Sequence, residues 1–297
     1  MTNFFNGTAT AMITPFGKDG GVDFDAFGRM IDYQIENGTD VLVILGTTGE
    51  PATMSEEEKE AVMRYSVEKV AKRAKIVFGS GSNSTAHAVD ASKKAEAFGA
   101  DGLLAVTPYY NKCTQNGIYE YYKAISDAVH IPIICYNVPP RTGVNILPAT
   151  MERIASLENI AGVKEACGNM EQICETARRI RGKCDLYSGD DNLNLPILAI
   201  GGAGLISVAS NIIPKETKML YNFVKAGNLD AANEIQDRML PVIDAMFMEV
   251  NPIPAKAAAE MIGLGGGRPR APLTELEPAH KEEMKKVLSD FGLHVIA

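Results

Sequence analysis

Eight short apolar segments, separated by segments with helical periodicity, recur between Thr8 and Val208. The run from Val41 to Leu45 is apolar throughout, which is typical of a parallel strand buried on both faces. Helix signals lie between the runs: Asp23 is a candidate N-cap, and Ser55 with Glu58 has the pattern of a capping box. Strands that alternate with helices at this spacing predict a parallel sheet, and eight of them predict a (β/α)₈ barrel. The predicted strands are Thr8–Thr14, Val41–Leu45, Ile76–Phe78, Leu103–Val106, Ile133–Tyr136, the residues around Val163, Leu186–Tyr187 and Leu205–Val208.

A doubly wound open sheet is the alternative fold, but the first predicted strand is not followed by a GxGxxG turn. The strand pattern stops at about residue 225. Helices are predicted beyond it, joined by a linker rich in Gly and Pro: Asp230–Phe247, Pro254–Ile262 and Pro278–Phe291, with the linker at Gly263–Pro272. We therefore expect a catalytic barrel over residues 1–225 and a C-terminal helical domain over residues 226–297.

Charge and composition exclude several classes of function. The chain of 297 residues has a net charge of −8, so nucleic acids and anionic membranes are poor candidate partners. Its five cysteines show no CxxC spacing, and its four histidines show no metal-ligand spacing, so we expect reduced thiols and no metal. The first six residues lack the pattern of a signal peptide, which predicts a cytoplasmic location.

Polar residues that could carry chemistry follow the predicted strands. In a parallel barrel these positions share one face, where the active site lies. The segments are Gly46–Glu50, Thr107–Lys112, Tyr136–Gly143, Lys164–Glu165, Ser188–Asp191 and Ser207. A lysine in a desolvated pocket has a lowered pKa and can attack a carbonyl carbon. Lys164 is therefore the candidate nucleophile for Schiff-base chemistry on a keto acid.

The neighbouring segments provide the groups that such a reaction needs. Tyr136 could shuttle protons, Thr47 could relay them, Thr48 could bind a carboxylate, and Arg141 could hold an acidic second substrate. These segments also have simpler interpretations. Lys164 could be a solvated lysine at a strand end, Tyr109–Tyr110 a packed aromatic pair, Thr47–Thr48 part of a turn, and Arg141 a surface arginine. Asp190–Asp191 could bind a metal, although Asp191 before Asn192 is at least as well explained as a helix cap.

Several motifs at matching spacing resemble the pyruvate-dependent class I aldolase and lyase family, which includes N-acetylneuraminate lyase. They are Gly46–Glu50, Thr107–Lys112, Tyr136–Pro139, Gly162–Glu165 and Asn251–Lys256, so that the resemblance extends over nearly the whole chain. Within this family, Arg141-Thr142-Gly143 points to members that condense pyruvate with L-aspartate 4-semialdehyde and cyclise the product, on the diaminopimelate route to lysine.

The resemblance implies specific roles. Lys164 would form the Schiff base with pyruvate, while Tyr136, Thr47 and Tyr110 would form a proton relay, Tyr110 reaching into a neighbouring subunit. Thr48 would hold the pyruvate carboxylate and Arg141 the carboxylate of the semialdehyde. The backbone at Gly189 and Ile206 would line the pocket. The family needs no cofactor besides the covalent Schiff base, and it implies a homo-oligomer, usually a tetramer built as a dimer of dimers.

The chain departs from the family pattern at Pro140 and Cys113, where glycine and proline are common. It also has Glu56, Lys59 and His87 where lysine-inhibited members carry two histidines and a glutamate. Lys59, and His87 when protonated, would repel lysine, so we expect weak or absent lysine inhibition.

Two alternatives stay open. One is N-acetylneuraminate lyase or a 2-keto-3-deoxy sugar acid aldolase, which would use the same Schiff base with another aldehyde. The other is a non-catalytic barrel that binds a keto acid and regulates a partner. Arg141 argues against the first and the complete set of relay residues against the second.

Overall fold

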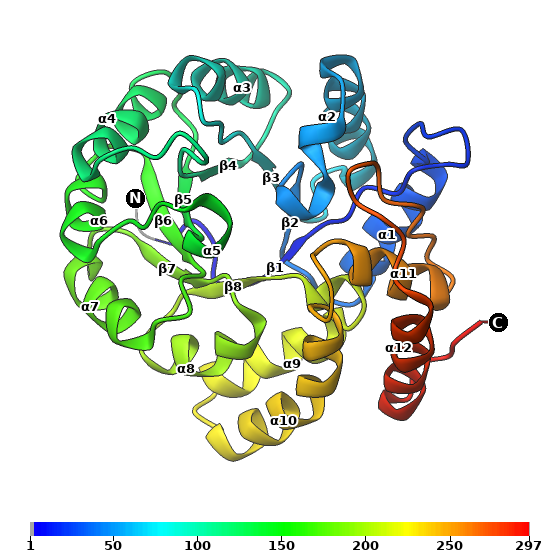
Figure 1. Ribbon diagram of the computed structural model, residues 1–297. Helices are drawn as coiled ribbons and strands as arrows, with labels where there is room; N and C mark the ends of the chain where they lie inside the picture. The colour runs from blue at the N-terminus through cyan, green and yellow to red at the C-terminus, as the bar shows by residue number, and fades with distance from the viewer. Residues whose placement is uncertain (1–2, 297) are drawn as a thin grey trace. The chain divides into compact units, whose positions relative to one another are not determined.

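The computed structural model describes residues 3–296 and has a closed barrel of strands in the order β1 to β8 (Figure 1). The predicted (β/α)₈ fold is therefore confirmed. The strands are β1 (Gly7–Ala11), β2 (Val41–Ile44), β3 (Lys75–Gly79), β4 (Gly102–Val106), β5 (Ile133–Asn137), β6 (Ile160–Glu165), β7 (Asp185–Ser188) and β8 (Gly204–Ser207). All residues of β1, β2, β5, β6 and β8 are buried, as expected for strands covered on both faces.

The helices that follow the strands are α1 (Phe24–Glu36), α2 (Glu56–Val70), α3 (Thr85–Ala97), α4 (Gln115–Ser126), α5 (Pro139–Thr142), α6 (Pro148–Ile154), α7 (Met170–Ile180), α8 (Asn194–Ala199) and α9 (Pro214–Lys225). Short 3₁₀ helices are η1 (Thr47–Gly49), η2 (Pro51–Thr53), η3 (Asp191–Leu193) and η4 (Ala209–Asn211). Three helices complete the chain: α10 (Leu229–Ala245), α11 (Ile253–Met261) and α12 (Pro278–Phe291). No helix within residues 3–296 is long and apolar enough to cross a membrane.

Local signals explain why the helices begin where they do. The Asp23 side chain accepts from the Ala26 N–H at the start of α1. Ser55 and Glu58 form both hydrogen bonds of the predicted capping box at the start of α2. The sequence pattern predicts a helix over Tyr119–Val129. Helix α4 begins four residues earlier, at Gln115, because Thr114 caps it by accepting from the Gly117 N–H.

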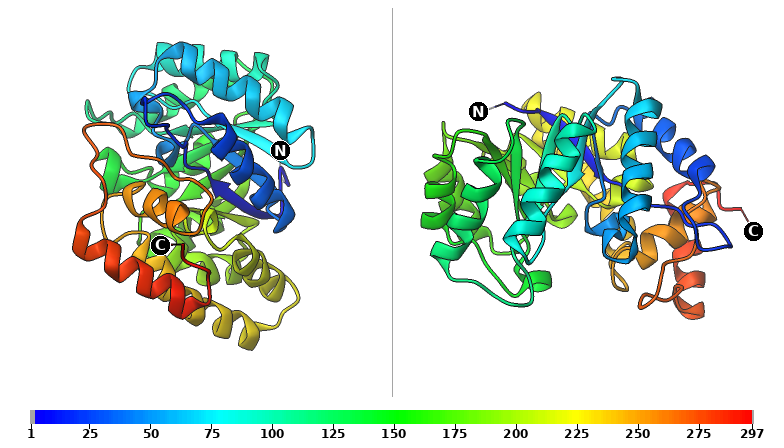
Figure 2. Two further views of the ribbon diagram at one scale, coloured as in Figure 1. Left: turned by 90° about the vertical axis from the view of Figure 1, so that its right-hand side faces the viewer. Right: turned by 90° about the horizontal axis from the view of Figure 1, so that it is seen from above.

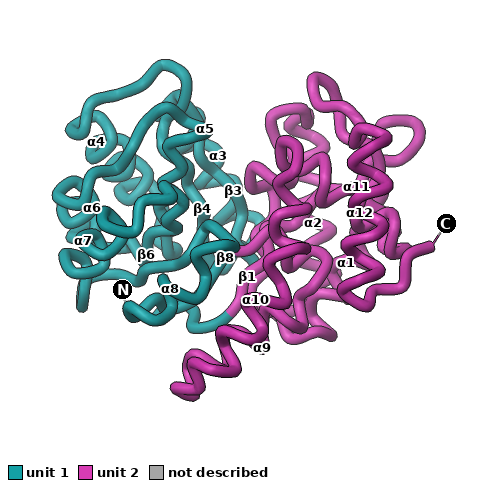
Figure 3. The backbone as a smooth tube through the Cα atoms, turned by 60° about the horizontal axis from the view of Figure 1, so that its bottom comes forward, with its two compact units in different colours: residues 1–7, 75–206 teal, residues 8–74, 207–297 magenta. Residues whose placement is uncertain are grey.

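The chain folds into two compact units (Figure 3). Unit 1 comprises Lys75–Ile206 together with the N-terminal segment up to Gly7. In it, α3, α4, α6 and α7 lie outside the strands that they follow or precede (Figure 1). Unit 2 comprises Thr8–Ala74 and the chain from Ser207 onward. In it, α12 packs against α10 and α11 (Figure 2). A domain boundary between residues 225 and 226 stays a prediction.

Register in unit 1 brings two predicted site residues side by side. Strands β5 and β6 are parallel, with Tyr136 opposite Lys164 and Asn137 opposite Glu165. On the other side of β6, Lys164 lies opposite Tyr187 of β7. The carboxyl ends of these strands therefore place the Tyr136 phenol beside the Lys164 amine on one face, and the Asn137 amide beside the Glu165 carboxyl group on the other.

Candidate active site

Lys164 is buried near the carboxyl end of β6, with 3% of its surface exposed. Its Nζ lies 4.3 Å from the centroid of the Tyr136 ring. Burial lowers the pKa of Lys164 to about 8; the charge of Arg141 acts in the same direction, and that of Asp191 opposes it. At pH 7 a pKa of about 8 leaves roughly one-tenth of the amine neutral, against about three in ten thousand at 10.5. The side chain is therefore suited to attack a carbonyl carbon.

Gly189, which follows β7, leaves the space that the Lys164 side chain occupies. A Cβ at this position would lie 2.8 Å from both Cε and Cγ of Lys164. The Gly189 N–H donates to the carbonyl of Glu165 at 2.8 Å, which fixes the backbone of the two strand ends together. Glycine is thus required here for close approach, and a larger residue would displace the candidate nucleophile.

Tyr136 is a buried phenol with 8% of its surface exposed. Burial raises the pKa of Tyr136 to about 12, with Asp190 adding to the shift and Arg141 opposing it. At neutral pH the phenol is therefore protonated, so it can donate a hydrogen bond and pass on a proton next to the amine.

Arg141 lies in α5, a single helical turn that begins with Pro139 and Pro140. Both prolines occupy the first turn of the helix, where the backbone needs no N–H donor. Gly143 ends the turn in the left-handed region at φ 69°. The Arg141 side chain is exposed at the surface of unit 1, and its charge acts on both Lys164 and Tyr136.

An amide network that sequence reasoning missed holds the two ends of the Arg141 segment. Asn137 Nδ2 donates to Glu165 Oε1 at 2.9 Å and to Asn145 Oδ1 at 3.0 Å. The Ile146 N–H donates to Asn137 Oδ1 at 2.9 Å, and Gln172 exchanges hydrogen bonds with Asn145. Asn137 stands in the Tyr136–Pro139 motif, but nothing in the sequence pairs it with Glu165.

Tyr110 lies in the loop between β4 and α4. Its side chain is 89% exposed, and its backbone has φ 69°. Its N–H donates to the Thr142 carbonyl at 3.4 Å, which links its loop to α5. Cys113, further along the same loop, is partly buried, and burial raises the pKa of its thiol. All five cysteines are free thiols, as predicted.

The prediction that Asp191 caps a helix is wrong. Asp190 is the N-cap of η3, and its side chain accepts from the Asn192 N–H at 3.2 Å. Asp191 is the first residue inside the turn and is buried, accepting from Asn194 Nδ2 at 3.0 Å. The sequence could not separate two adjacent aspartates, because either can accept from an N–H two or three residues later. Within residues 3–296 the structure has no cluster of three or more side chains suited to hold a metal.

Thr47 and Thr48 follow β2 in unit 2, where they begin the 3₁₀ turn η1. Thr47 is exposed, whereas Thr48 is 3% exposed, and its Oγ1 accepts a hydrogen bond from Asn251 Nδ2 at 2.9 Å. Since Oγ1 is the acceptor in this bond, the Thr48 hydroxyl hydrogen can still be donated to another group. Ile206, the last residue of unit 1, is buried in β8.

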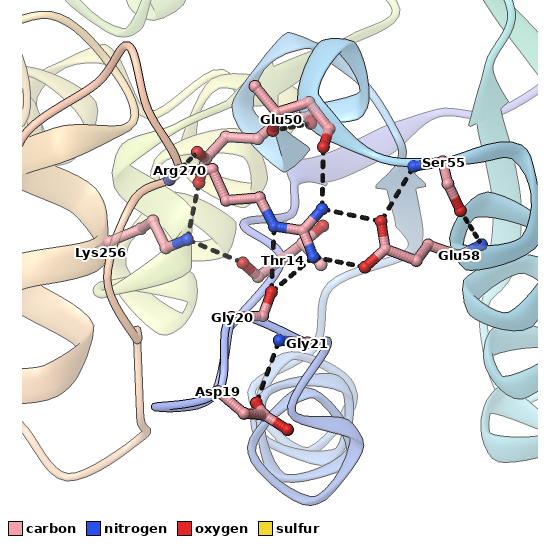
Figure 4. Close-up of polar contacts among 10 residues, drawn as sticks. Thr14, Asp19, Gly20, Gly21, Glu50, Ser55, Glu58, Lys256 and Arg270 are labelled. Atoms are coloured by element: carbon pink, nitrogen blue, oxygen red, sulfur yellow. Dashed lines mark hydrogen bonds and ion pairs between the residues drawn. The ribbon is translucent and has the colours of Figure 1, made fainter.

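A buried ion pair, also missed by sequence reasoning, lies directly after this turn. Glu50 Oε1 accepts from Lys256 Nζ at 2.6 Å, and both side chains are almost fully buried (Figure 4). Glu50 Oε2 accepts from the Arg270 N–H at 2.9 Å. The guanidinium of Arg270 in turn forms a bidentate ion pair with Glu58. In the sequence, Lys256 stands only at the end of the Asn251–Lys256 motif, which gives no sign of its partner Glu50.

Comparison with known proteins agrees with this arrangement. The sequence model of the Dihydrodipicolinate synthetase family matches residues 4–291. The chain is 48% identical over 293 residues to the 4-hydroxy-tetrahydrodipicolinate synthase of Caldicellulosiruptor bescii, which covers 99% of both chains. It is also similar to a crystal structure of dihydrodipicolinate synthase from Aquifex aeolicus, with 42% identity, a TM-score of 0.96 and coverage of 99% and 100%. A crystal structure of the chloride-inhibited dihydrodipicolinate synthase from Acinetobacter baumannii, complexed with pyruvate, has 39% identity, a TM-score of 0.94 and coverage of 97% and 99%.

Proposed function

The chain belongs to the dihydrodipicolinate synthetase family, and we propose that it has the activity of a 4-hydroxy-tetrahydrodipicolinate synthase. In this reaction pyruvate condenses with L-aspartate 4-semialdehyde, and the product cyclises. The observation that carries the proposal is the buried Lys164 amine, whose pKa is lowered to about 8 beside the Tyr136 ring. A desolvated amine next to a neutral phenol is the arrangement that Schiff-base chemistry on a keto acid needs.

The proposed first step forms a bond between Lys164 Nζ and the C2 carbonyl carbon of pyruvate, and water leaves. Tyr136 donates and recovers the protons that this dehydration requires, with Thr47 as relay. Loss of a methyl proton to the relay then gives the enamine, whose carbon attacks the aldehyde, and the aldehyde oxygen takes up a proton from the relay. The amino group of the former semialdehyde then attacks C2 and displaces the Lys164 amine, which closes the ring and frees the enzyme. In this proposal Thr48 and the η1 backbone bind the pyruvate carboxylate, while Arg141 binds the carboxylate of the second substrate bidentately. The backbone at Gly189 and Ile206 lines the pocket.

No metal or organic cofactor takes part in the proposed steps, and the absence of a cofactor stays a prediction. So does the cytoplasmic location. The set of Lys164, Tyr136 and Arg141 favours the synthase over a sugar-acid aldolase, because an acidic aldehyde calls for a cation. The names of the relatives point the same way.

Borohydride trapping with pyruvate, followed by peptide mass mapping, tests the mechanism. We expect one reduced pyruvate adduct on Lys164 and turnover when L-aspartate 4-semialdehyde is supplied. Absence of the adduct would refute the Schiff-base mechanism. An adduct without turnover of the semialdehyde, but with turnover of N-acetylmannosamine, would instead assign the chain to the lyase branch. An adduct with no aldehyde turned over would favour the regulatory barrel.

We also propose a homo-oligomer, arranged as a dimer of dimers, in which Tyr110 acts in a neighbouring subunit. The nearly complete exposure of the Tyr110 phenol supports this proposal, since an unburied phenol cannot serve a desolvated site in its own subunit. Tyr110→Phe is expected to lower kcat by about 10- to 100-fold, with little change in the pyruvate KM, because general acid–base catalysis contributes on this scale. Steady-state assays check this, with sedimentation to show that assembly is intact. An unchanged kcat would remove Tyr110 from the relay.

Weak or absent inhibition by lysine remains part of the proposal. Lys59 carries one of the repelling charges, although its Nζ pairs with Glu56 at 2.8 Å, which partly balances it. Steady-state inhibition by sub-millimolar lysine would contradict this prediction.

A further inference from the structure

The most completely buried cation in unit 2 has no role in the proposed reaction. Lys256 in α11 is 0% exposed, and each of its three ammonium hydrogens has an acceptor within hydrogen-bond distance. Nζ lies 2.6 Å from Glu50 Oε1 and 3.0 Å from the Thr14 carbonyl (Figure 4). It also lies 3.1 Å from the Arg268 carbonyl. A neutral amine could satisfy only two of these acceptors, so the geometry fits an ammonium ion.

Lys256 therefore joins three segments that are distant in sequence. Thr14 follows β1, Glu50 ends η1 after β2, and Arg268 lies in the loop between α11 and α12. The Nζ also lies 4.1 Å from the centroid of the Phe16 ring. Burial lowers the pKa of Lys256, whereas the Glu50 carboxylate opposes the shift. A buried ammonium with this many contacts fixes the relative position of the segments it joins.

Glu50 transmits this constraint to the turn that carries Thr47 and Thr48. Its backbone is in the left-handed region, at φ 55° and ψ 39°, and its N–H donates to the Thr47 carbonyl at 3.2 Å. A non-glycine residue keeps this conformation only where its surroundings hold it there. Both carboxylate oxygens of Glu50 are anchored, one by Lys256 and one by the Arg270 N–H. Release of the carboxylate would let Glu50 leave this conformation and move η1.

The same segment of the chain supports the turn at a second point. Asn251, five residues before Lys256, donates to the Thr48 hydroxyl at 2.9 Å. Gly49 packs closely on the chain after β1, because a Cβ there would lie 3.2 Å from Thr14 Oγ1. Thr14 is also a partner of Lys256, so the ammonium holds both the turn and the surface on which the turn packs.

We propose that Lys256, acting through Glu50, is a positioning residue that holds the Thr47–Gly49 turn in the conformation that receives the carboxylate of the keto-acid substrate. This inference rests on the proposed function, since it assigns that carboxylate to the turn. Lys256 touches no reacting atom. Its loss weakens substrate binding at the turn and shifts the Thr47 relay, while the Lys164 amine itself stays in place.

The test uses Lys256→Met, Glu50→Gln and the double variant of both, in the full-length enzyme. The concentration of competent sites is first counted by borohydride trapping at saturating pyruvate. Per competent site, each single variant is expected to raise the pyruvate KM by about 10- to 100-fold, with a smaller loss of kcat because Thr47 moves with the turn. The double variant, which leaves no unpaired buried charge, is expected to recover part of the KM. Lys285→Met, which removes an exposed lysine of the same unit paired with Glu282, is the matched control and should leave the KM unchanged.

The outcomes separate this inference from the proposed function. If wild type forms the Lys164 adduct and both single variants keep the wild-type KM per competent site, the positioning role is refuted and the function stands. A purely structural role would lower the number of competent sites and leave their KM unchanged, which also refutes it. If Lys256→Met does not fold, the KM of Glu50→Gln decides. If wild type forms no adduct, the proposed function fails, and this inference fails with it.

Discussion

Two buried glutamates follow strands of the barrel, and they are held in different ways. Glu50 comes after β2 and η1, and Glu165 ends β6; they are 4% and 1% exposed. Glu50 is bound by a buried ammonium and a backbone N–H. Glu165 is bound by the amide of Asn137 and the N–H of Cys167, at 2.9 and 3.0 Å from the same oxygen. The Glu50 carboxylate is thus paired with a full positive charge, whereas the Glu165 carboxyl group is hydrogen-bonded only by neutral N–H donors.

The partners also differ in sequence distance. Lys256 lies 206 residues from Glu50, whereas Asn137 and Cys167 lie 28 and 2 residues from Glu165. The ionic contact fastens segments that are far apart along the chain, and the amide contacts fasten adjacent strand ends. Because an isolated buried charge costs far more than a displaced dipole, the two networks should respond very differently to the loss of one member.

Removal of the counter-charge is expected to have the largest effect on stability. Lys256→Met leaves the buried Glu50 carboxylate without its hydrogen-bonded cation, so the free energy of unfolding should fall by about 3–5 kcal/mol. Urea unfolding followed by circular dichroism at one protein concentration measures this. The double variant with Glu50→Gln should regain part of the loss. A single variant as stable as wild type would show that the charges are not coupled.

Neutralisation of Glu50 alone, in Glu50→Gln, is expected to cause the second largest loss in the free energy of unfolding. Each oxygen of Glu50 faces a donor, Lys256 Nζ on one side and the Arg270 N–H on the other. The amide NH₂ of Glu50→Gln must therefore oppose a donor in either orientation, which costs about 2–3 kcal/mol, since a hydrogen bond to a charged group is lost. The same urea titration checks this value, and a loss below that of Glu165→Gln would contradict the comparison.

Sequence reasoning reached the architecture because its signals are local. Apolar runs marked the strands, and the capping box at Ser55 marked the start of α2. The predicted bounds of the last helix, Pro278–Phe291, agree with α12. The family predicted from the motifs is confirmed by the match over residues 4–291. The errors were also local: the start of α4 and the cap at Asp190 depended on which of several nearby polar side chains makes a hydrogen bond.

Less of the candidate site could be predicted. The motifs named the residues that follow each strand, and the register places Tyr136 beside Lys164. The motifs gave no sign of the contacts that hold these residues in place. Glu50 and Lys256 stood in two separate motifs, and no periodicity connects positions 206 residues apart. Contacts of this kind depend on tertiary packing, so only the folded chain reveals which buried charge meets which.

Neutralisation of Glu165, in Glu165→Gln, is expected to lower the free energy of unfolding less than Glu50→Gln does. The Asn137 amide and the Cys167 N–H both donate to Oε1, so the carbonyl oxygen of Glu165→Gln can keep both bonds. Only the longer contact of Asn137 with Oε2, at 3.2 Å, is replaced by an unfavourable pairing of donors. The expected loss is about 1 kcal/mol or less. Urea midpoints of the two glutamine variants, measured side by side, give the ranking directly.

The smallest expected effect is a change with pH in the stability difference between wild type and Glu165→Gln. Burial raises the pKa of Glu165 above its usual 4.5, and no cation offsets the shift. The folded state therefore holds this proton more tightly than the unfolded state, so Glu165 stabilises the fold at low pH and loses this contribution as pH rises through its folded pKa. Relative to Glu165→Gln, wild type should gain stability as pH falls from 7 towards 4.5. Urea midpoints of both proteins at several pH values in this window test the sign. A constant difference between them would mean that Glu165 keeps its proton across the window, or that its carboxylate is solvated, and either result would end the contrast with Glu50.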